Sequence, residues 1–189
     1  MVFSSIPFLY YFLPAVLAVY FLTPRKGKNA VLLLASLIFY GWGELRLLPL
    51  MVFTIGLCYV CGLDIEHSRN RKKLWLLASI VISVGLLGVF KYADFFIGSL
   101  NAVTGLKIPL LHLALPVGIS FYTFQCLSYT IDVYRGSVPA QKSLINFGAY
   151  VALFPQLIAG PIVRYADIAR ELEHREHSWE NAAAGLRRF

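Results

Sequence analysis

Four polar side chains share one face of a predicted helix in the middle of the chain. Gln125, Ser128, Tyr129 and Asp132 are spaced at i, i+3, i+4 and i+7, which places them above one another on a helix surface. The opposite face is apolar. A polar stripe in apolar surroundings either makes hydrogen bonds between helices or lines a polar tunnel. The spacing leaves both interpretations open.

The two ends of this stripe carry further signals. Asp132 and Arg135 are three residues apart, so they can form an ion pair at the end of the helix. Pro116 and Gly118 precede the helix and predict a break in the backbone there.

A second segment combines helix breakers with one uncharged polar side chain. Pro155, Gly160 and Pro161 interrupt an apolar stretch that contains Gln156 and ends at Arg164. Broken helices at membrane depth commonly frame binding sites, and a simple packing kink is the alternative. Gln156 and Arg164 are therefore candidate groove residues, and the three breakers are candidate structural positions.

No complete catalytic or metal-binding set is present in the sequence. None of the four histidines has a carboxylate or hydroxyl partner at a spacing that suggests a base and nucleophile; they are His67, His112, His174 and His177. Cys58 and Cys61 form a C-x-x-C without a second ligand pair, so buried thiols are the simpler interpretation. We predict no catalytic residue, no metal and no bound cofactor in this chain.

The composition identifies the setting in which these side chains work. Of the 189 residues, 58% are hydrophobic and only 14% are charged, against about 25% charged in soluble domains. Mean hydropathy is +0.67. A chain with so few charged side chains cannot cover a water-facing surface, so the sequence predicts an integral membrane protein embedded in a lipid bilayer.

Long apolar runs predict an all-α, polytopic helical bundle with about five to six membrane segments. The runs are 6–22, 30–42, 47–63, 74–90, 108–131 (broken at Pro116) and 144–163, with a short interfacial segment at 95–106. The bundle is expected to occupy residues 1–163.

The basic residues predict an orientation. The loops 23–29 and 64–73 carry three and four Lys or Arg, whereas the loop between them carries only Arg46. The positive-inside rule therefore places these two loops in the cytoplasm, and the loop 132–143 falls on the same side. Simple alternation would put the tail outside. We favour a re-entrant 144–163 segment over translocation of the tail, because its proline and glycine residues break the helix.

Residues 164–189 are predicted to form a charged interfacial helix after the membrane region. This tail balances five basic with five acidic residues, so the net charge of +7 arises before residue 164. The excess positive charge lies in short loops next to apolar runs, a pattern typical of contact with anionic lipid headgroups. Nucleic acid is therefore excluded as a partner.

Several of these segments resemble the membrane-bound O-acyltransferase (MBOAT) family, in particular its bacterial alginate O-acetylation branch. The motif L-P-V-G-I-S-F-Y, followed by Y-x-I-D-V-Y-R-G, covers residues 115–136, and F-P-x-L-I-A-G-P begins at Phe154. The similarity also includes residues 1–5, 39–42 and 90–95, in order through essentially the whole chain.

The resemblance implies a partial MBOAT fold in the bacterial inner (cytoplasmic) membrane, with a tunnel through its core. It implies transfer of acetyl groups, with acetyl-CoA as donor, toward an exported polysaccharide. A periplasmic acetyltransferase partner and the polysaccharide export machinery are expected with it. Related branches act on peptidoglycan or teichoic acid. The polar stripe and the 156–164 turn would then shape the tunnel or its cytoplasmic mouth.

One departure from the family affects the mechanism. Family members are more than twice as long, and their active-site histidine lies in a W-H-x-S-type motif in the second half. This sequence contains no Trp-His pair. We therefore expect the N-terminal portion of such an enzyme, inactive alone. The rival hypothesis is a membrane transporter or scaffold subunit without covalent chemistry.

Overall fold

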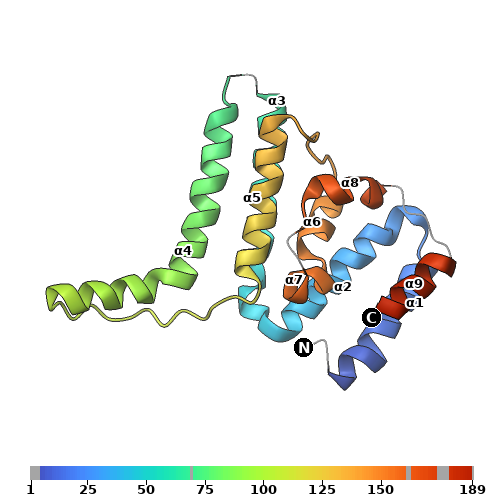
Figure 1. Ribbon diagram of the computed structural model, residues 1–189, viewed down its shortest axis with the longest axis horizontal. Coiled ribbons are helices and arrows are strands. Elements are labelled where there is room, and N and C mark those ends of the chain that lie inside the picture. The colour runs from blue at the N-terminus through green and yellow to red at the C-terminus, as the bar shows by residue number, and fades with distance from the viewer. Residues whose placement is uncertain (1–4, 69, 161–162, 174–178, 189) are drawn as a thin grey trace.

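The computed structural model describes residues 5–68, 70–160, 163–173 and 179–188. All regular structure within these ranges is helical (Figure 1). The helices are α1 (Leu13–Leu22), α2 (Lys28–Glu44), α3 (Leu48–His67), α4 (Lys72–Thr104), α5 (Ile119–Arg135), α6 (Leu144–Ala152), α7 (Phe154–Ala159), α8 (Tyr165–Glu173) and α9 (Trp179–Arg188). A π-helical turn, Phe8–Phe12, precedes α1, and short 3-10 turns flank α2 at Arg25–Gly27 and Leu45–Leu47. The predicted all-α class is confirmed.

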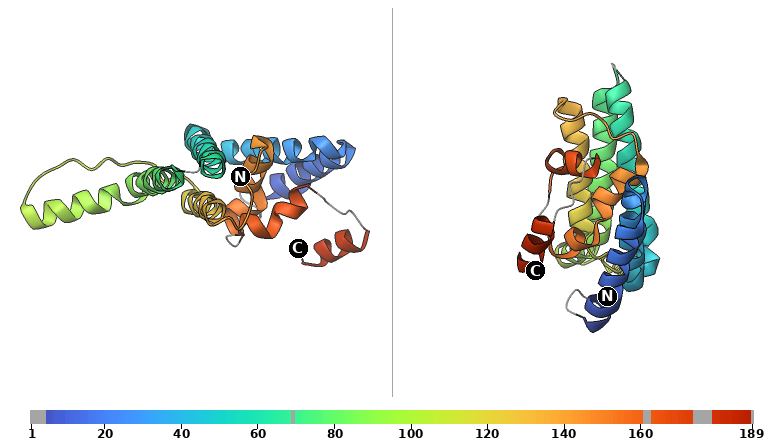
Figure 2. Two further views of the ribbon diagram at one scale, coloured as in Figure 1. Left: turned by 90° about the horizontal axis from the view of Figure 1, so that it is seen from above. Right: turned by 90° about the vertical axis from the view of Figure 1, so that its right-hand side faces the viewer.

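The core forms where α3, α4 and α5 pack side by side and α6 lies along α2 (Figures 1 and 2). α3 and α5 approach each other closely at Gly62, where the ring of Tyr129 occupies the space a side chain would need. Cys58, Cys61 and Cys126 are free thiols buried in this core. A second cluster joins the N-terminal turn to α2 and α7 through Phe8, Phe39 and Phe154.

In the part of the chain that the structure describes, two helical stretches are long and apolar enough to cross a membrane, 25–67 and 72–104. The first contains both α2 and α3 with the turn between them, and shorter apolar helices cover 8–22 and 144–157. The expectation of five to six membrane segments stays a prediction.

The loops assigned to the cytoplasm by their charge lie together at one end of the bundle. The Tyr59 hydroxyl on α3 donates to the Lys142 carbonyl at 2.7 Å. At the start of α2, Asn29 Nδ2 donates to Asn146 Oδ1 on α6 at 2.8 Å and to the Leu172 carbonyl on α8 at 2.9 Å. We call this the basic end, and the opposite end, where α2 turns into α3, the arm end.

The segment from α6 to α8 enters the bundle and returns to the end where it started. The helix breaks at Leu153, α7 begins with Pro155 in its first turn, and Gly160 ends it in an extended conformation. Tyr165, at the start of α8, then bonds to Gln141 beside the start of α6. The predicted breaker Pro161 lies outside the described residues.

The start of α5 corrects one expectation. The apolar run 108–131 was expected to be a membrane segment broken at Pro116, but residues 105–118 are not helical, and α5 begins only at Ile119. Proline residues at 109 and 116 remove helix hydrogen bonds. Gly118 adopts a positive φ of 73°, and a Cβ there would lie 3.1 Å from the Leu157 carbonyl oxygen of α7.

Most of the segment 95–106 belongs to the second half of α4, which runs unbroken for 33 residues and ends at Thr104. Its expected interfacial location stays a prediction. Figures 1 and 2 show this half projecting from the bundle and residues 105–118 running back along it. In the tail, the single charged helix expected at 164–189 is described as α8 and α9. Residues 174–178, which include His174 and His177, lie outside the description.

A polar line along α5 as the candidate functional site

The predicted polar stripe lies on α5 and is largely buried. Gln125 is 1% exposed and Tyr129 is fully buried, while Ser128 and Asp132 are half-buried. Arg135 is exposed at the last turn of the helix. The stripe therefore runs from the interior of the bundle to the surface at its basic end.

The half of the stripe nearer the basic end is tied into a network of hydrogen bonds. The Tyr129 hydroxyl accepts the Gln141 backbone N–H at 2.9 Å, and Gln141 Nε2 donates to the Tyr165 hydroxyl at 2.9 Å. Gln141 Oε1 accepts the Ser143 N–H at 3.0 Å. Ser128 donates to the Gln125 carbonyl. These groups act as links between α5, α6 and α8.

Aromatic rings surround the same network. The Tyr129 ring lies 4.5 Å from Phe147 and 5.1 Å from Tyr165, measured between centroids. Tyr150 also packs on Tyr165 at 5.4 Å, and its hydroxyl donates to the Val163 carbonyl at 2.8 Å. The basic-end half of the stripe is thus a rigid, satisfied structure.

The half nearer the arm end is different, because buried polar atoms there have no hydrogen-bond partner among the described residues. These atoms are the hydroxyls of Tyr40 and Tyr122, Gln125 Oε1 and Gln156 Nε2. Two further buried atoms without a partner in the described part of the chain are Ser5 Oγ, before the N-terminal turn, and Asn29 Oδ1, at the basic end. Leaving such an atom unpaired costs about 1–3 kcal/mol, so each one calls for a functional or structural explanation.

Three helices bring these unpartnered groups toward one region. Tyr122 on α5 interacts electrostatically with Tyr40 and Glu44 of α2. Gln156 lies on α7, whose start is fixed to α2 by the Phe154 N–H donating to Ser36 Oγ at 3.2 Å. The close contact between Gly118 and Leu157 joins the start of α5 to α7. All four unpartnered groups near the arm end are uncharged hydroxyls or amides carried by α2, α5 and α7.

The sequence missed Tyr40 and Tyr122 as site candidates, because a tyrosine in an apolar run is usually a core residue. The signal was available for Tyr122, which lies three residues before Gln125 on the same helix face. Nothing in the spacing could connect Tyr40 or Gln156 to α5.

The remaining candidates do not all gather together. Gln156 lies toward the arm end, whereas Arg164 is exposed directly before α8 at the basic end. The breakers Pro116, Gly118, Pro155 and Gly160 occupy the start of α5 and both ends of α7.

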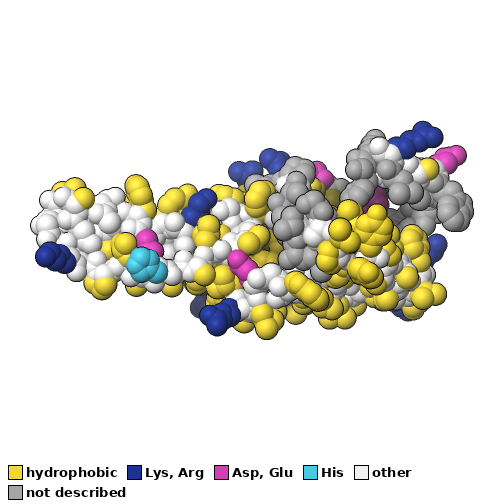
Figure 3. Space-filling view, turned by 90° about the horizontal axis from the view of Figure 1, so that it is seen from below, with side chains coloured by type: hydrophobic (Ala, Val, Ile, Leu, Met, Phe, Trp, Pro, Cys, Tyr) yellow, Lys and Arg dark blue, Asp and Glu magenta, His cyan; other side chains and the backbone are white. Residues whose placement is uncertain are grey.

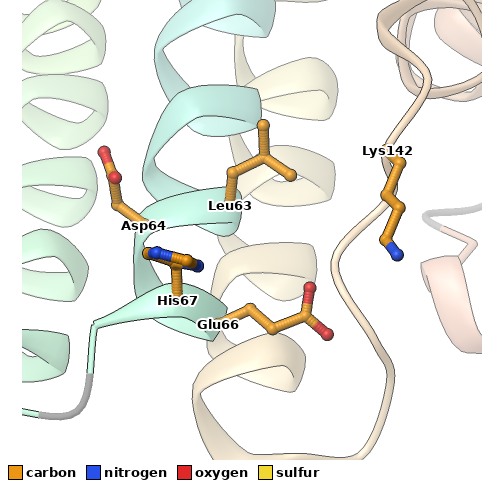
Figure 4. Close-up of a pocket in the computed structure, with 5 residues that line it drawn as sticks. All are labelled: Leu63, Asp64, Glu66, His67 and Lys142. Atoms are coloured by element: carbon orange, nitrogen blue, oxygen red, sulfur yellow. The ribbon is translucent and has the colours of Figure 1, made fainter.

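Open pockets lie at both ends of the bundle. At the basic end, a pocket of about 520 Å³ is lined by Leu63, Asp64, Glu66, His67 and Lys142. Figure 4 shows Glu66 and Lys142 approaching it from α3 and from the loop before α6. At the arm end, residues 41–47 and Ala114 line a pocket of about 500 Å³. Among the described residues, no three His, Cys, Asp or Glu side chains gather closely enough to hold a metal ion.

Fold and site together define an all-helical protein with membrane-spanning character and a polar line through its interior. Comparison with known proteins shows which proteins the chain is similar to. The chain is 43% identical over its full length to proteins named probable alginate O-acetylase AlgI from Azotobacter vinelandii and Pseudomonas aeruginosa. It is 31% identical, over 98% of its length, to a peptidoglycan O-acetyltransferase from Helicobacter pylori.

These similarities confirm the resemblance to the bacterial alginate O-acetylase branch that the motifs indicated. The chain spans 39%, 38% and 42% of the length of these three relatives. No protein-family profile and no solved structure matches it. The chain is therefore similar to bacterial O-acetyltransferases over a part of their length.

Proposed function

We propose that this chain forms part of a membrane O-acyltransferase of the MBOAT type. In this proposal it transfers acetyl groups from cytoplasmic acetyl-CoA toward an exported, alginate-like polysaccharide. The full-length similarity to proteins named alginate O-acetylase supports this substrate class over peptidoglycan, for which the identity is lower. The protein would lie in the bacterial inner membrane as a multi-pass protein, with a periplasmic acetyltransferase partner and the polysaccharide export machinery.

The observation that carries the proposal is the set of unpartnered buried polar atoms near the arm end. Helix association alone favours paired polar groups, as found around Gln141. Groups left unpaired at a cost are typical of sites that bind a substrate. In this proposal Tyr122, Gln125, Tyr40 and Gln156 line the acyl path, and Ser128, Tyr129 and Asp132 continue it toward the basic end. No histidine of this chain is assigned as the catalytic base.

A pair of conservative variants tests this role. Tyr122→Phe and Gln125→Leu remove unpartnered polar atoms, so the protein should be as stable as the wild type or more stable. Acetylation of the exported polysaccharide should nevertheless fall at least tenfold. The measurement is acetyl content per uronic acid in a strain whose own acetylase gene is deleted, normalised to the amount of the full-length protein in the membrane.

Tyr165→Phe serves as the matched control, because its hydroxyl accepts a hydrogen bond from Gln141 Nε2 and it lies outside the proposed acyl path. This variant should lose stability, with acetylation per folded molecule close to normal. If Tyr122→Phe and Gln125→Leu left acetylation unchanged, the polar line would be structural. A scaffold or transporter subunit would then be the better account.

A further inference from the structure

The segment that projects from the bundle has its own architecture. It consists of the second half of α4, from Lys91 to Thr104, and the non-helical segment 105–117, which runs back along it. We call the two together the arm, and 105–117 the returning segment. Figure 2 shows it clear of the other helices, and Figure 3 shows hydrophobic side chains along it. Val103 is 86% exposed and Phe96 is 64% exposed. Large apolar side chains this exposed along one segment are typical of an interaction surface.

The helical half of the arm is amphipathic. Tyr92, Phe96 and Val103 fall at i, i+4 and i+11, which places them on one face, and all three are exposed. Phe95 and Leu100 flank this face and are also exposed. We call these five residues the apolar face of the arm.

The other side of the helix holds the returning segment through paired hydrogen bonds. Asn101 Nδ2 donates to the Ile108 carbonyl at 2.8 Å, and Asn101 Oδ1 accepts the Ile108 N–H at 3.0 Å. The Asp94 carboxylate accepts the N–H groups of Leu111 and His112 at 2.7 and 3.0 Å. At the end of the returning segment, Glu44 accepts the Val117 N–H at 3.1 Å.

These hydrogen bonds matter because non-helical backbone is costly away from water. A backbone N–H or C=O group that lacks a hydrogen bond in an apolar medium raises the free energy by several kcal/mol. The side chains of Asp94, Asn101 and Glu44 form hydrogen bonds with backbone groups of the returning segment. They satisfy the N–H groups of Ile108, Leu111, His112 and Val117 and the carbonyl of Ile108, which lowers the cost of placing this non-helical segment at a membrane boundary.

The direction of the arm indicates what its exposed face contacts. It runs across the direction of α3, α5 and the first half of α4 (Figure 1). If these helices cross a bilayer, the arm lies along its surface, at the end opposite the basic loops. Lys91 begins the helical half, with its Nζ 3.4 Å from Ser120 Oγ, and Lys107 lies in the returning segment just after Thr104. Lysine side chains at such places can reach lipid phosphates.

We propose that the arm is an in-plane membrane anchor whose apolar face enters the boundary between lipid headgroups and acyl chains. The partner is the bilayer surface, and the anchor fixes the height of the arm-end pocket and of the start of α5 relative to it. This proposal concerns membrane attachment and does not depend on acetyl transfer.

Depth-dependent quenching of tryptophan fluorescence tests the anchor. In full-length protein in which every tryptophan, Trp42, Trp75 and Trp179 included, is replaced by phenylalanine, a single tryptophan is introduced by Phe96→Trp or Val103→Trp. Val84→Trp, at an exposed position in the first half of α4, is the matched control. Each protein is reconstituted in phosphatidylethanolamine and phosphatidylglycerol vesicles with phosphatidylcholine brominated either near the headgroup or near the end of the acyl chain.

The ratio of shallow to deep quenching should exceed one at positions 96 and 103 and fall below one at position 84. The more exposed Val103 keeps the test decisive if Phe96→Trp fails to fold. Absence of quenching at 96 and 103, with normal quenching at 84, would mean that protein or water covers the arm and would overturn the proposal. Stronger deep quenching at the arm would also overturn it, because the arm would then be inserted. Absence of quenching at 84 would reject the membrane location itself.

Discussion

The close approach of α3 to α5 at Gly62 predicts a sharp difference between two glycine substitutions on one helix. A Cβ at Gly62 would lie 2.6 Å from Cε1 and 2.8 Å from the hydroxyl oxygen of Tyr129. A Cβ at Gly56, also on α3, would meet nothing within 4 Å. Gly62→Ala should therefore destabilise the protein, and Gly56→Ala should not.

The magnitude follows from what holds the Tyr129 ring in place. Restoring an ordinary carbon–carbon contact requires a shift of about 1 Å. The ring is fully buried, lies 4.5 Å from Phe147, and is tethered to Gln141 by its hydroxyl. Overpacking at such a site costs about 1–3 kcal/mol, and losing the tether costs about 1 kcal/mol more. Replacing glycine by alanine in a helix returns up to about 1 kcal/mol.

Gly56→Ala receives only the favourable helix term, so the two variants should differ by about 2–4 kcal/mol in unfolding free energy. For a chain of this size the difference in Tm is on the order of 10 °C. The assay is the fraction of detergent-solubilised protein that stays monodisperse on size-exclusion chromatography after heating.

A double variant isolates the contact. Tyr129→Leu removes the ring atoms that a new methyl group would meet, so adding Gly62→Ala to it should cost far less than adding it to the wild type. Equal melting temperatures for Gly62→Ala and Gly56→Ala would refute the close helix contact on which this reasoning rests.

Two further substitutions probe the start of α5 and the network at the basic end. Gly118→Ala forces a non-glycine residue into a φ of 73° and brings a methyl group to 3.1 Å from the Leu157 carbonyl; we expect a loss of about 1–3 kcal/mol, measured by the same thermal assay, whereas an unchanged Tm would show that α7 does not pack on this turn. Tyr165→Phe leaves the buried Gln141 amide without its acceptor, so stability should fall by about 1–3 kcal/mol and protease cleavage before α8 should accelerate; unchanged proteolysis would contradict the link between Gln141 and α8.

The sequence predicted the local features of the site well. Gln125 and Tyr129 were placed on one helix face by their spacing alone, and both are buried. The break at Pro155 was expected because proline cannot continue a helix hydrogen-bond ladder, and the structure breaks at the residue ahead of α7. Such features depend on a few neighbouring residues.

Features that depend on distant partners were not predictable. The unpartnered state of Tyr122 and its proximity to Tyr40 require knowing how α2 packs against α5. The non-helical segment 105–118 resembled part of a membrane-spanning helix in the sequence because its composition is apolar. Its conformation is set by Asp94 and Asn101, whose side chains compete for the backbone hydrogen bonds that a helix would use.

The hydrogen bonds of Asn29 have a consequence for biosynthesis. The Asn29 amide donates to Asn146 and to the carbonyl of Leu172, partners 117 and 143 residues further along the chain. At bacterial or eukaryotic elongation rates, these partners emerge from the ribosome roughly 6–29 s after Asn29. The Asn29 amide at the start of α2 therefore lacks its hydrogen-bond partners during the time in which α3, α4 and α5, which are close in sequence, can pack together. Assembly of this chain is ordered in time, and insertion factors that shield polar groups should act on α2 longest.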